Sequence, residues 1–291
     1  MTLDAEAIRR VAELEFVAKS AVDGFLSGRH RSRFRGASLE FAQHREYVQG
    51  DDLRHLDWKV WARGDRLTVK QYEAETNLAA LFAIDASASM NYGEGDKNKF
   101  GCARRIAAAL SYLLVSQSDA VGAAFMGESL GNELAPRTGR AQFHALTAAL
   151  ANCEPGGTGD VAARLFEMGS RGGVRGLRIV VSDFYGDVER IASSVSGLRR
   201  RGHDVIAFHV LHRDELELPF ERFSRFEGME DDLHATCNPA ALRDAYRESI
   251  ADHCARLRRR FLAMKADYRF VPTDQPLGET LAGFLLERMR S

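Results

Sequence analysis

Residues 77–89 read NLAALFAIDASAS, and this stretch decides the fold. Residues 78–84 are all apolar, and the run ends abruptly at Asp85. A short apolar run of this kind is typical of a strand that is buried on both faces of a parallel sheet. We therefore expect a central strand over residues 77–84 that delivers Asp85 at its carboxyl end.

The rest of the chain alternates between strand and helix patterns. Further strands are expected at residues 120–126, 133–135, 177–182, 204–211 and 268–271. Helices are expected at residues 3–26, 99–116, 140–151, 188–201, 239–265 and 277–290, with one more after residues 156–158. Such alternation gives a mainly parallel sheet with helices on both faces. We predict a doubly wound α/β fold with six strands in the order 3-2-1-4-5-6, strand 3 being an antiparallel edge.

Two segments interrupt the alternation. Residues 28–75 mix Arg, His, Asp, Gly and aromatic residues densely, and residues 213–237 scatter acidic and aromatic residues around Pro219. We predict that residues 1–75 form an N-terminal helix and a signature segment packed on the core. Residues 76–291 would form the main domain, with a small β insertion at about 212–238.

Bulk properties exclude several classes of protein. The 291 residues carry a formal net charge of -1, so no overall field attracts nucleic acid or anionic lipid. The four cysteines form no Cys-x-x-Cys pair, which argues against a zinc ribbon or a disulfide-stapled secreted domain. The N-terminus lacks the apolar stretch of a signal peptide or membrane span. We expect a cytoplasmic protein with no membrane span and no nucleic-acid partner.

The residues after the central strand have the chemistry of a cation site. Asp85, Ser87 and Ser89 can turn three oxygens inward from one loop, at the sheet edge where open α/β folds bind ligands. Thr158 and Asp183 follow later strands and would arrive at the same edge. Hard oxygen ligands suit Mg²⁺, or Mn²⁺ or Ca²⁺ in its place. One coordination position would remain open for a carboxylate of another protein.

The Asp-x-Ser-x-Ser pattern resembles the metal-ion-dependent adhesion site of von Willebrand factor A domains. The signature segment also resembles a bacterial family called domain of unknown function fifty-eight. The residues that carry this second resemblance are Gly28, Arg29, His30, Gly36, Phe41, Arg45, Glu46, Tyr47, Gly50, Asp51, Asp52, Arg54, Asp57, Trp58, Ala62, Arg63, Lys70 and Glu75, followed by residues 85–90. In the family the threonine loop usually continues directly into Asp, whereas Gly159 intervenes here before Asp160. Either Thr158 or Asp160 is then the residue that faces the cation.

The family resemblance implies a role and a partner. It implies partnership with a MoxR-type AAA+ ATPase, to which the protein would hand a client protein or acidic peptide as an adaptor or co-chaperone. From this resemblance together with the open coordination position, we predict a metal-dependent binding module and not an enzyme.

The charged residues of the signature segment have two interpretations. They could form a partner-binding surface, or a buried ion-pair lattice that docks the segment on the sheet, which we favour because aromatic residues are interleaved with the charges. The residues concerned are Arg45, Asp51, Asp52, Arg54, Asp57, Trp58 and Arg63. A scaffold that binds through residues 28–75, with a structural metal or none, is therefore an alternative.

Two enzyme classes are alternatives to a binding module. Ser129 lies in a Gly-x-Ser-x-Gly pattern, but a second short strand, not a helix, is expected to follow it, which favours a hairpin over a nucleophile elbow. A phosphotransferase with Asp85 as nucleophile would need a second acid two residues later, where Ser87 stands.

Overall fold

The computed structural model describes residues 5–28, 41–46, 68–72 and 78–281. The chain divides into two compact units, of which the larger comprises residues 1–30 and 78–291 and the smaller residues 31–77. In the smaller unit, strands β1 (Phe41–Glu46) and β2 (Thr68–Tyr72) pair antiparallel.

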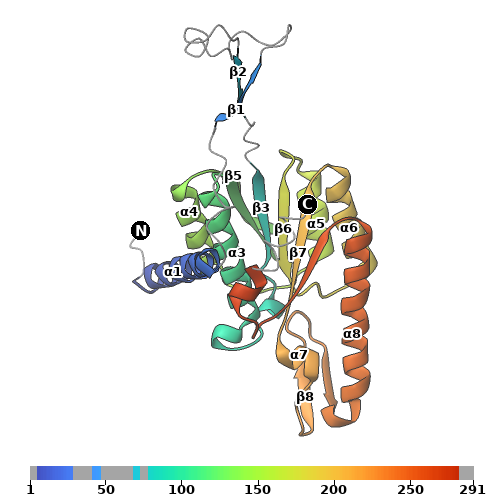
Figure 1. Cartoon of the computed structure of the whole chain (residues 1–291). Coiled ribbons are helices and arrows are strands. Elements are labelled where there is room, and N and C mark those ends of the chain that lie inside the picture. The colour runs from blue at the N-terminus through green and yellow to red at the C-terminus, as the bar shows by residue number, and fades with distance from the viewer. Residues whose placement is uncertain (1–4, 29–40, 47–67, 73–77, 282–291) are drawn as a thin grey trace. The chain divides into compact units, whose positions relative to one another are not determined.

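The larger unit is built on one six-stranded sheet (Figure 1). Its strands are β3 (Ala79–Asp85), β4 (Ala120–Met126), β5 (Leu130–Arg137), β6 (Leu177–Ser182), β7 (Asp204–Leu211) and β10 (Asp267–Pro272). They lie in the order β10-β7-β6-β3-β4-β5, and only the β4–β5 pair is antiparallel. The predicted fold class, strand order and antiparallel edge are confirmed.

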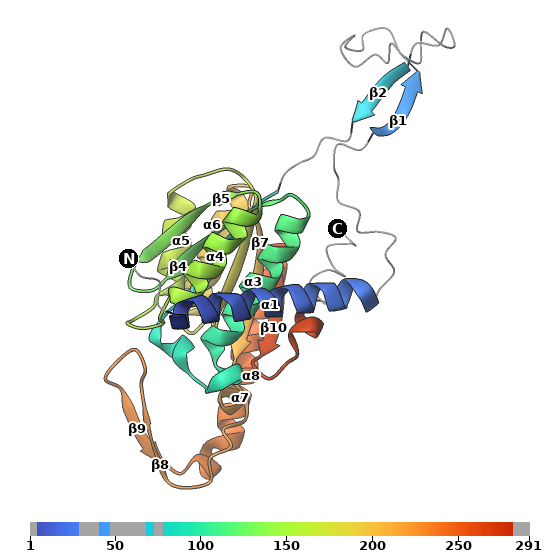
Figure 2. The ribbon, with the colours of Figure 1, turned by 90° about the vertical axis from the view of Figure 1, so that its left-hand side faces the viewer.

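Strand β3 is buried on both faces because helices cover the sheet on both sides (Figures 1 and 2). Phe82 and Ile84 pack in one core with α3 (Lys99–Ser116), α4 (Arg140–Asn152) and part of α1 (Ala5–Gly28). Leu81 and Ala83 pack in the other core, with α5 (Val161–Ser170), α6 (Val188–Arg200) and α8 (Pro239–Ala263). Successive side chains alternate between faces, so the apolar run serves both cores. Truncating Phe82 to alanine would cost about 3–5 kcal/mol.

Helix α1 closes one side of the domain. Ala18 and Val22 are buried in the core with α3, and Glu15 contacts Thr147 of α4 at 3.2 Å. Arg10 forms an ion pair with Glu154 at 3.1 Å, at the start of the loop that leads to α5. The expected amphipathic helix is confirmed, and it packs by its small apolar face.

The insertion consists of α7 (Arg213–Glu217) and a hairpin of β8 (Ser224–Glu227) and β9 (His234–Cys237). The hairpin is a separate two-stranded sheet, as the expected β excursion requires. Both ribbon views show it standing apart from the six-stranded sheet (Figures 1 and 2).

The edge strand differs from the prediction in length. β5 covers residues 130–137, whereas the sequence indicated only residues 133–135. Its pairing with β4 shifts register twice, and Gly122 lies so close to the β5 backbone that a Cβ there would be 2.3 Å from the carbonyl oxygen of Leu134. This irregularity hides the strand from a pattern of period two.

Across the described residues, no helix combines the length and apolarity needed to span a membrane.

Candidate metal site

The candidate site lies where β3 and β6 end side by side. Ile84 of β3 pairs with Val181 of β6, so Asp85 and Ser182 leave the sheet together. The backbone N–H of Ala86 donates to the carbonyl of Met126 at 2.8 Å and ties the next loop to β4. The chain thus delivers its first polar residues at the carboxyl edge of a parallel sheet, as expected.

Asp85 organises the loop that follows it. Its Oδ1 accepts hydrogen bonds from the Ser87 hydroxyl at 2.7 Å and the Ser87 N–H at 3.0 Å. Its Oδ2 accepts from the Ser182 hydroxyl at 2.5 Å, and Ser87 Oγ lies 3.1 Å from Ser89 Oγ. Ser87 precedes the short 3-10 helix η2 (Ala88–Asn91), yet its side chain makes no capping hydrogen bond. The serines therefore serve the Asp85 cluster and do not act as a helix cap.

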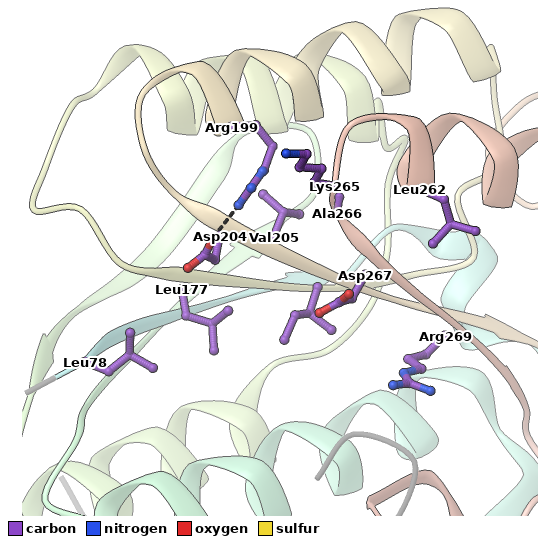
Figure 3. A pocket seen from close by; sticks show the side chains of 11 residues that line it. Leu78, Leu177, Arg199, Asp204, Val205, Leu262, Lys265, Ala266, Asp267 and Arg269 are labelled. Atoms are coloured by element: carbon purple, nitrogen blue, oxygen red, sulfur yellow. Dashed lines mark hydrogen bonds and ion pairs between the residues drawn. The ribbon is translucent and has the colours of Figure 1, made fainter. Parts of the chain in front are cut away.

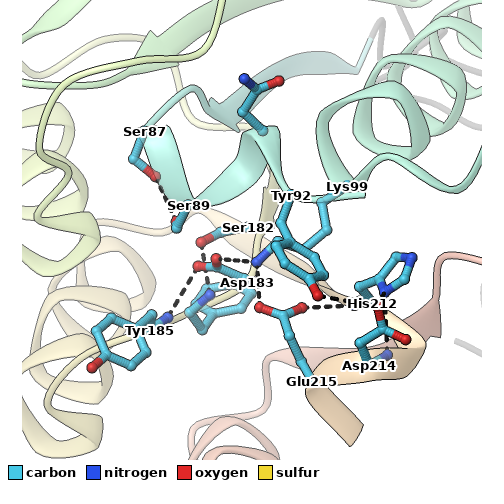
Figure 4. Close-up of polar contacts among 12 residues, drawn as sticks. Ser87, Ser89, Tyr92, Lys99, Ser182, Asp183, Tyr185, His212, Asp214 and Glu215 are labelled. Atoms are coloured by element: carbon cyan, nitrogen blue, oxygen red, sulfur yellow. Dashed lines mark hydrogen bonds and ion pairs between the residues drawn. The ribbon is translucent and has the colours of Figure 1, made fainter. Parts of the chain in front are cut away.

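Asp183 joins the same cluster from β6. Asp183 Oδ1 accepts from the N–H of Tyr185 at 3.2 Å (Figure 4), and a hydrogen bond from the Ser89 side chain helps to lower the pKa of Asp183. Asp85, Ser87 and Asp183 are each less than 5% exposed. The structure thus brings together four of the five residues predicted to hold a cation.

The fifth, Thr158, lies on a loop held against the Asp85 loop. Ala88 N–H donates to Gly157 O at 3.0 Å, and Gly156 N–H donates to Ala86 O at 2.9 Å. Thr158 itself is exposed, and its neighbour Gly159 lies against the cluster. A Cβ at Gly159 would be 2.5 Å from Ser87 Cβ, so only glycine fits at this close approach.

Asp160, the alternative to Thr158, is engaged elsewhere. Its Oδ1 accepts from the Ala163 N–H at 3.0 Å and caps α5, while its Oδ2 pairs with Arg190 of α6 at 2.7 Å. The intervening Gly159 is what separates this carboxylate from the cluster. Of the two residues, Thr158 is therefore the one that this loop could offer to a cation.

A buried lysine that sequence reasoning missed occupies the far side of Asp183. Lys99 is 1% exposed, and its Nζ lies 2.8 Å from Asp183 Oδ2 and 2.6 Å from Glu215 Oε1 (Figure 4). Lys99 is the first residue of α3, where the helix dipole disfavours a positive charge. The two carboxylates offset this disadvantage and fix the ammonium group in place.

Glu215 comes from the insertion and is positioned by a capping box. Its Oε2 accepts from the N–H of His212 at 2.7 Å, while the His212 side chain accepts from the first turn of α7. Tyr92 packs on the His212 ring and donates to Asp214 at 3.0 Å. A His-x-x-Glu capping pattern at 212–215 was the one sequence signal for this residue.

Charge is unevenly balanced within the site. Burial raises the pKa of Asp183, but the positive charge and hydrogen bond of Lys99 lower it. The effect of Lys99 is among those that outweigh burial, so the pKa of Asp183 lies below its usual value. The pKa of Asp85 rises from 3.8 to about 7, because the carboxyl is buried and because Asp183 is negatively charged. Lys99 thus neutralises Asp183 and Glu215 in part and leaves Asp85 without a positive partner among the described residues.

This chemistry fits a hard divalent cation. The oxygens near Asp85 are carboxylates and hydroxyls, which are the donors that Mg²⁺ and Mn²⁺ prefer, and the excess negative charge lies at Asp85. Within the described ranges, no three His, Cys, Asp or Glu side chains form a metal cluster by themselves. Serine hydroxyls would therefore have to complete the ligand set.

Other residues singled out from the sequence are placed as follows. Ser129 lies in the β4–β5 turn, where Gly127 N–H donates to Ser129 O, so the expected hairpin is confirmed. Arg45 lies in β1. The remaining candidates for partner binding, Asp51, Asp52, Arg54, Asp57, Trp58 and Arg63, lie outside the described residues.

A pocket also exists at the opposite edge of the sheet (Figure 3). Leu177, Asp204 and Asp267 line it from the amino ends of β6, β7 and β10, and Arg199 pairs with Asp204 beside it. Open α/β sheets bind ligands at the carboxyl ends of their strands. The Asp85 edge is therefore the stronger candidate.

Comparison with known proteins identifies the family. The model of the family described as protein of unknown function DUF58 matches residues 43–256. The chain belongs to this family. An uncharacterized protein from Mycobacterium tuberculosis is 28% identical to this chain over 292 residues, which cover 99% of this chain and 91% of that protein.

Solved structures with similar folds have low sequence identity. Conserved hypothetical protein BatB from Bacteroides thetaiotaomicron is 15% identical, with a TM-score of 0.47 over 74% of this chain and 100% of that one. The SpRpn10 VWA domain is 11% identical, with a TM-score of 0.40 over 70% and 94% of the two chains. Manganese-loaded Plasmodium vivax TRAP protein is 20% identical, with a TM-score of 0.35 over 45% and 57%. These likenesses to solved structures concern the fold alone.

Proposed function

We propose that this DUF58 protein is a divalent-cation-dependent protein-binding module, not an enzyme. The observation that carries the proposal is the hydroxyl of Ser87, which bridges Asp85 and Ser89 at the sheet edge beside Asp183. Asp85, Ser87 and Ser89 would hold the cation, with Asp183 and Thr158 binding directly or through water. A bound cation would supply a positive centre with a position open to a partner's carboxylate.

A neighbouring pocket supports a protein partner. Asp183 and Glu215 line it on one side, and Tyr246, Ile250 and His253 of α8 line it on the other. Tyr185 also lines the pocket, and the residue is 79% exposed. A partner whose acidic side chain reaches the Asp85 cluster has room there for an adjoining apolar side chain. Exposed aromatic residues beside polar groups are typical of protein interfaces.

The partner we propose is a MoxR-type AAA+ ATPase, with a client protein or acidic peptide as cargo. This part of the proposal rests on the family resemblance of the signature segment. The sequence itself has no phosphate-binding loop, so ATP hydrolysis would belong to the ATPase. A reading frame for such an ATPase next to the gene would support the pairing.

The test combines metal binding and partner capture. Asp85→Asn and Ser87→Ala should abolish Mg²⁺ or Mn²⁺ binding in titration calorimetry and release a purified MoxR-type ATPase in a pull-down, as EDTA should. Ser129→Ala is the matched control, because Ser129 is an exposed turn serine outside the hydrogen-bonded cluster of Asp85, Ser87 and Ser89. Unchanged metal binding and unchanged capture by both variants would refute the proposal.

A scaffold function is the second candidate. The observation that favours it is that residues 31–77 form a compact unit of their own, which contains β1 and β2. In the same pull-down, Arg45→Glu would then release the partner while Asp85→Asn retained it. The opposite result supports the cation-dependent module.

A further inference from the structure

The β8–β9 hairpin of the insertion places the carboxylate of Glu230 against the candidate metal site. Glu230 lies in the turn between β8 and β9, which the N–H of Gly228 closes by donating to Leu233 O at 2.7 Å. Its Oε1 accepts from the N–H of Ser89 at 3.2 Å, and its Oε2 accepts from the N–H of Gly159 at 2.9 Å. One carboxylate thus joins the two loops that frame the cluster.

The hairpin touches the site through this side chain. Glu230 is half-buried, whereas Met229, Asp231 and Asp232 on either side of it are exposed. Among the described residues, the other hydrogen bonds and ion pairs of residues 224–237 stay within the hairpin or its adjoining residues. The polar contact between the hairpin and the site is therefore local and consists of the two hydrogen bonds of Glu230.

The two amides form a position that recognises a carboxylate. Ser89 and Gly159 present N–H groups from separate loops to the two oxygens of one group, an arrangement that fixes a planar anion. Ser89 is itself an expected cation ligand, and Gly159 lies against Ser87. A carboxylate on these amides therefore stands beside any cation held by the serines.

We propose that Glu230 occupies the position at which an acidic side chain of a protein partner binds, so that the β8–β9 hairpin is an internal competitor that the partner must displace. This inference rests on the proposed cation-dependent binding and adds to it the position and the competitor. The partner's Glu or Asp would accept the same two N–H groups. An isolated two-stranded hairpin is only marginally stable, so its release is energetically accessible.

Hydrogen exchange tests the contact itself. Glu230→Gln should speed amide exchange at Ser89 and Gly159, because a neutral amide has one acceptor oxygen in place of two. The matched control is Asp232→Asn, which removes the same charge from an exposed side chain of the same turn. Equal exchange in Glu230→Gln and wild type would overturn the proposal, and this readout does not depend on metal binding.

A peptide competition tests the exchange of ligands. The probe is a labelled peptide with the sequence of residues 225–236, RFEGMEDDLHAT, added with Mg²⁺. Glu230→Ala protein should bind it at least about tenfold more tightly than wild type, whose own Glu230 competes. A peptide with Gln at the Glu230 position should lose this binding. Equal affinities for the two proteins, or no peptide binding while calorimetry shows bound Mg²⁺, would overturn the inference. If calorimetry shows no Mg²⁺ binding, the proposed function fails separately, and the exchange measurement still decides the Glu230 contact.

Discussion

The floor of the site and the insertion above it are built in opposite ways. The floor, which we define as Asp85, Ser87, Ser89, Ser182 and Asp183, sits at the ends of central strands, and most of it is buried. The insertion, residues 212–238, exposes most of its hairpin and sends Glu215 and Glu230 to the site. The fold thus places the floor on buried strand ends and carries Glu215 and Glu230 on an insertion whose hairpin is largely exposed. The following changes test this difference, from the largest expected effect to the smallest.

Lys99→Met should give the largest loss of stability, because Lys99 joins the floor to the insertion. Without it, Asp183 is left buried with no cation beside it, and removal of one partner of a buried pair costs about 3–5 kcal/mol. Urea unfolding followed by circular dichroism measures the change. Lys97→Met, at an exposed lysine two residues earlier, is the control and should be nearly neutral. Equal stabilities for the two variants would show that the joint is unimportant.

Gly159→Ala should disrupt the floor without touching its charges. The added Cβ would meet Ser87 Cβ at 2.5 Å, and forced overpacking of this kind costs about 1–3 kcal/mol. Mg²⁺ affinity should fall with it. Gly156→Ala is the matched control, since nothing lies within 4 Å of a Cβ there. Thermal unfolding and calorimetry on the pair would reveal whether the close approach matters.

Asp85→Asn should stabilise the metal-free protein by about 1–2 kcal/mol at pH 8, since a buried charge is removed. The folded-state pKa of Asp85 is raised from 3.8 to about 7, so the ionised form is disfavoured by folding. Above pH 7 this lowers wild-type stability, and the loss is relieved as the pH falls from 7 towards 4. Unfolding in EDTA across this range should show the dependence in wild type and a smaller one in Asp85→Asn. A wild-type stability in EDTA that does not fall between pH 4 and pH 7 would contradict the charge imbalance, because this measurement leaves the hydrogen bonds of Asp85 intact.

Arg225→Ala should have the smallest effect. The residue pairs with Glu227 at 3.1 Å, but both side chains are more than 60% exposed, and such pairs contribute at most about 1 kcal/mol. The midpoint of urea unfolding should hardly move. A loss as large as that of Gly159→Ala would mean that the hairpin is integral to the domain.

Most residues of the floor could be predicted from the sequence, because they follow directly after short apolar runs that form strands. The apolar run before Asp85 fixes β3, the run before Asp183 fixes β6, and parallel pairing brings both ends to one edge. Ser182 escaped notice because it reads as the last residue of a buried strand, although its hydroxyl bonds to Asp85.

The surrounding charges could not be foretold in the same way. Lys99 reads as an ordinary lysine at a helix start, and only contacts 84 and 116 residues away in the chain bury it. Glu230 lies in an acidic turn of the kind that is usually exposed to solvent. No periodic pattern in the sequence predicts that this turn contacts Ser89. For Thr158 the difficulty is different. The sequence pattern predicts it as a ligand but does not reveal that its neighbour Gly159 is the residue that lies against Ser87.

The tether of Glu230 has a quantitative consequence for selectivity. A group carried on the same chain by a short connection acts like a free ligand at a millimolar effective concentration. Dissolved amino acids or short acidic metabolites below that concentration would not shift the hairpin by their carboxylate alone. A successful competitor has to make further contacts around its acidic residue. The hairpin would therefore favour the binding of protein surfaces over that of small acids.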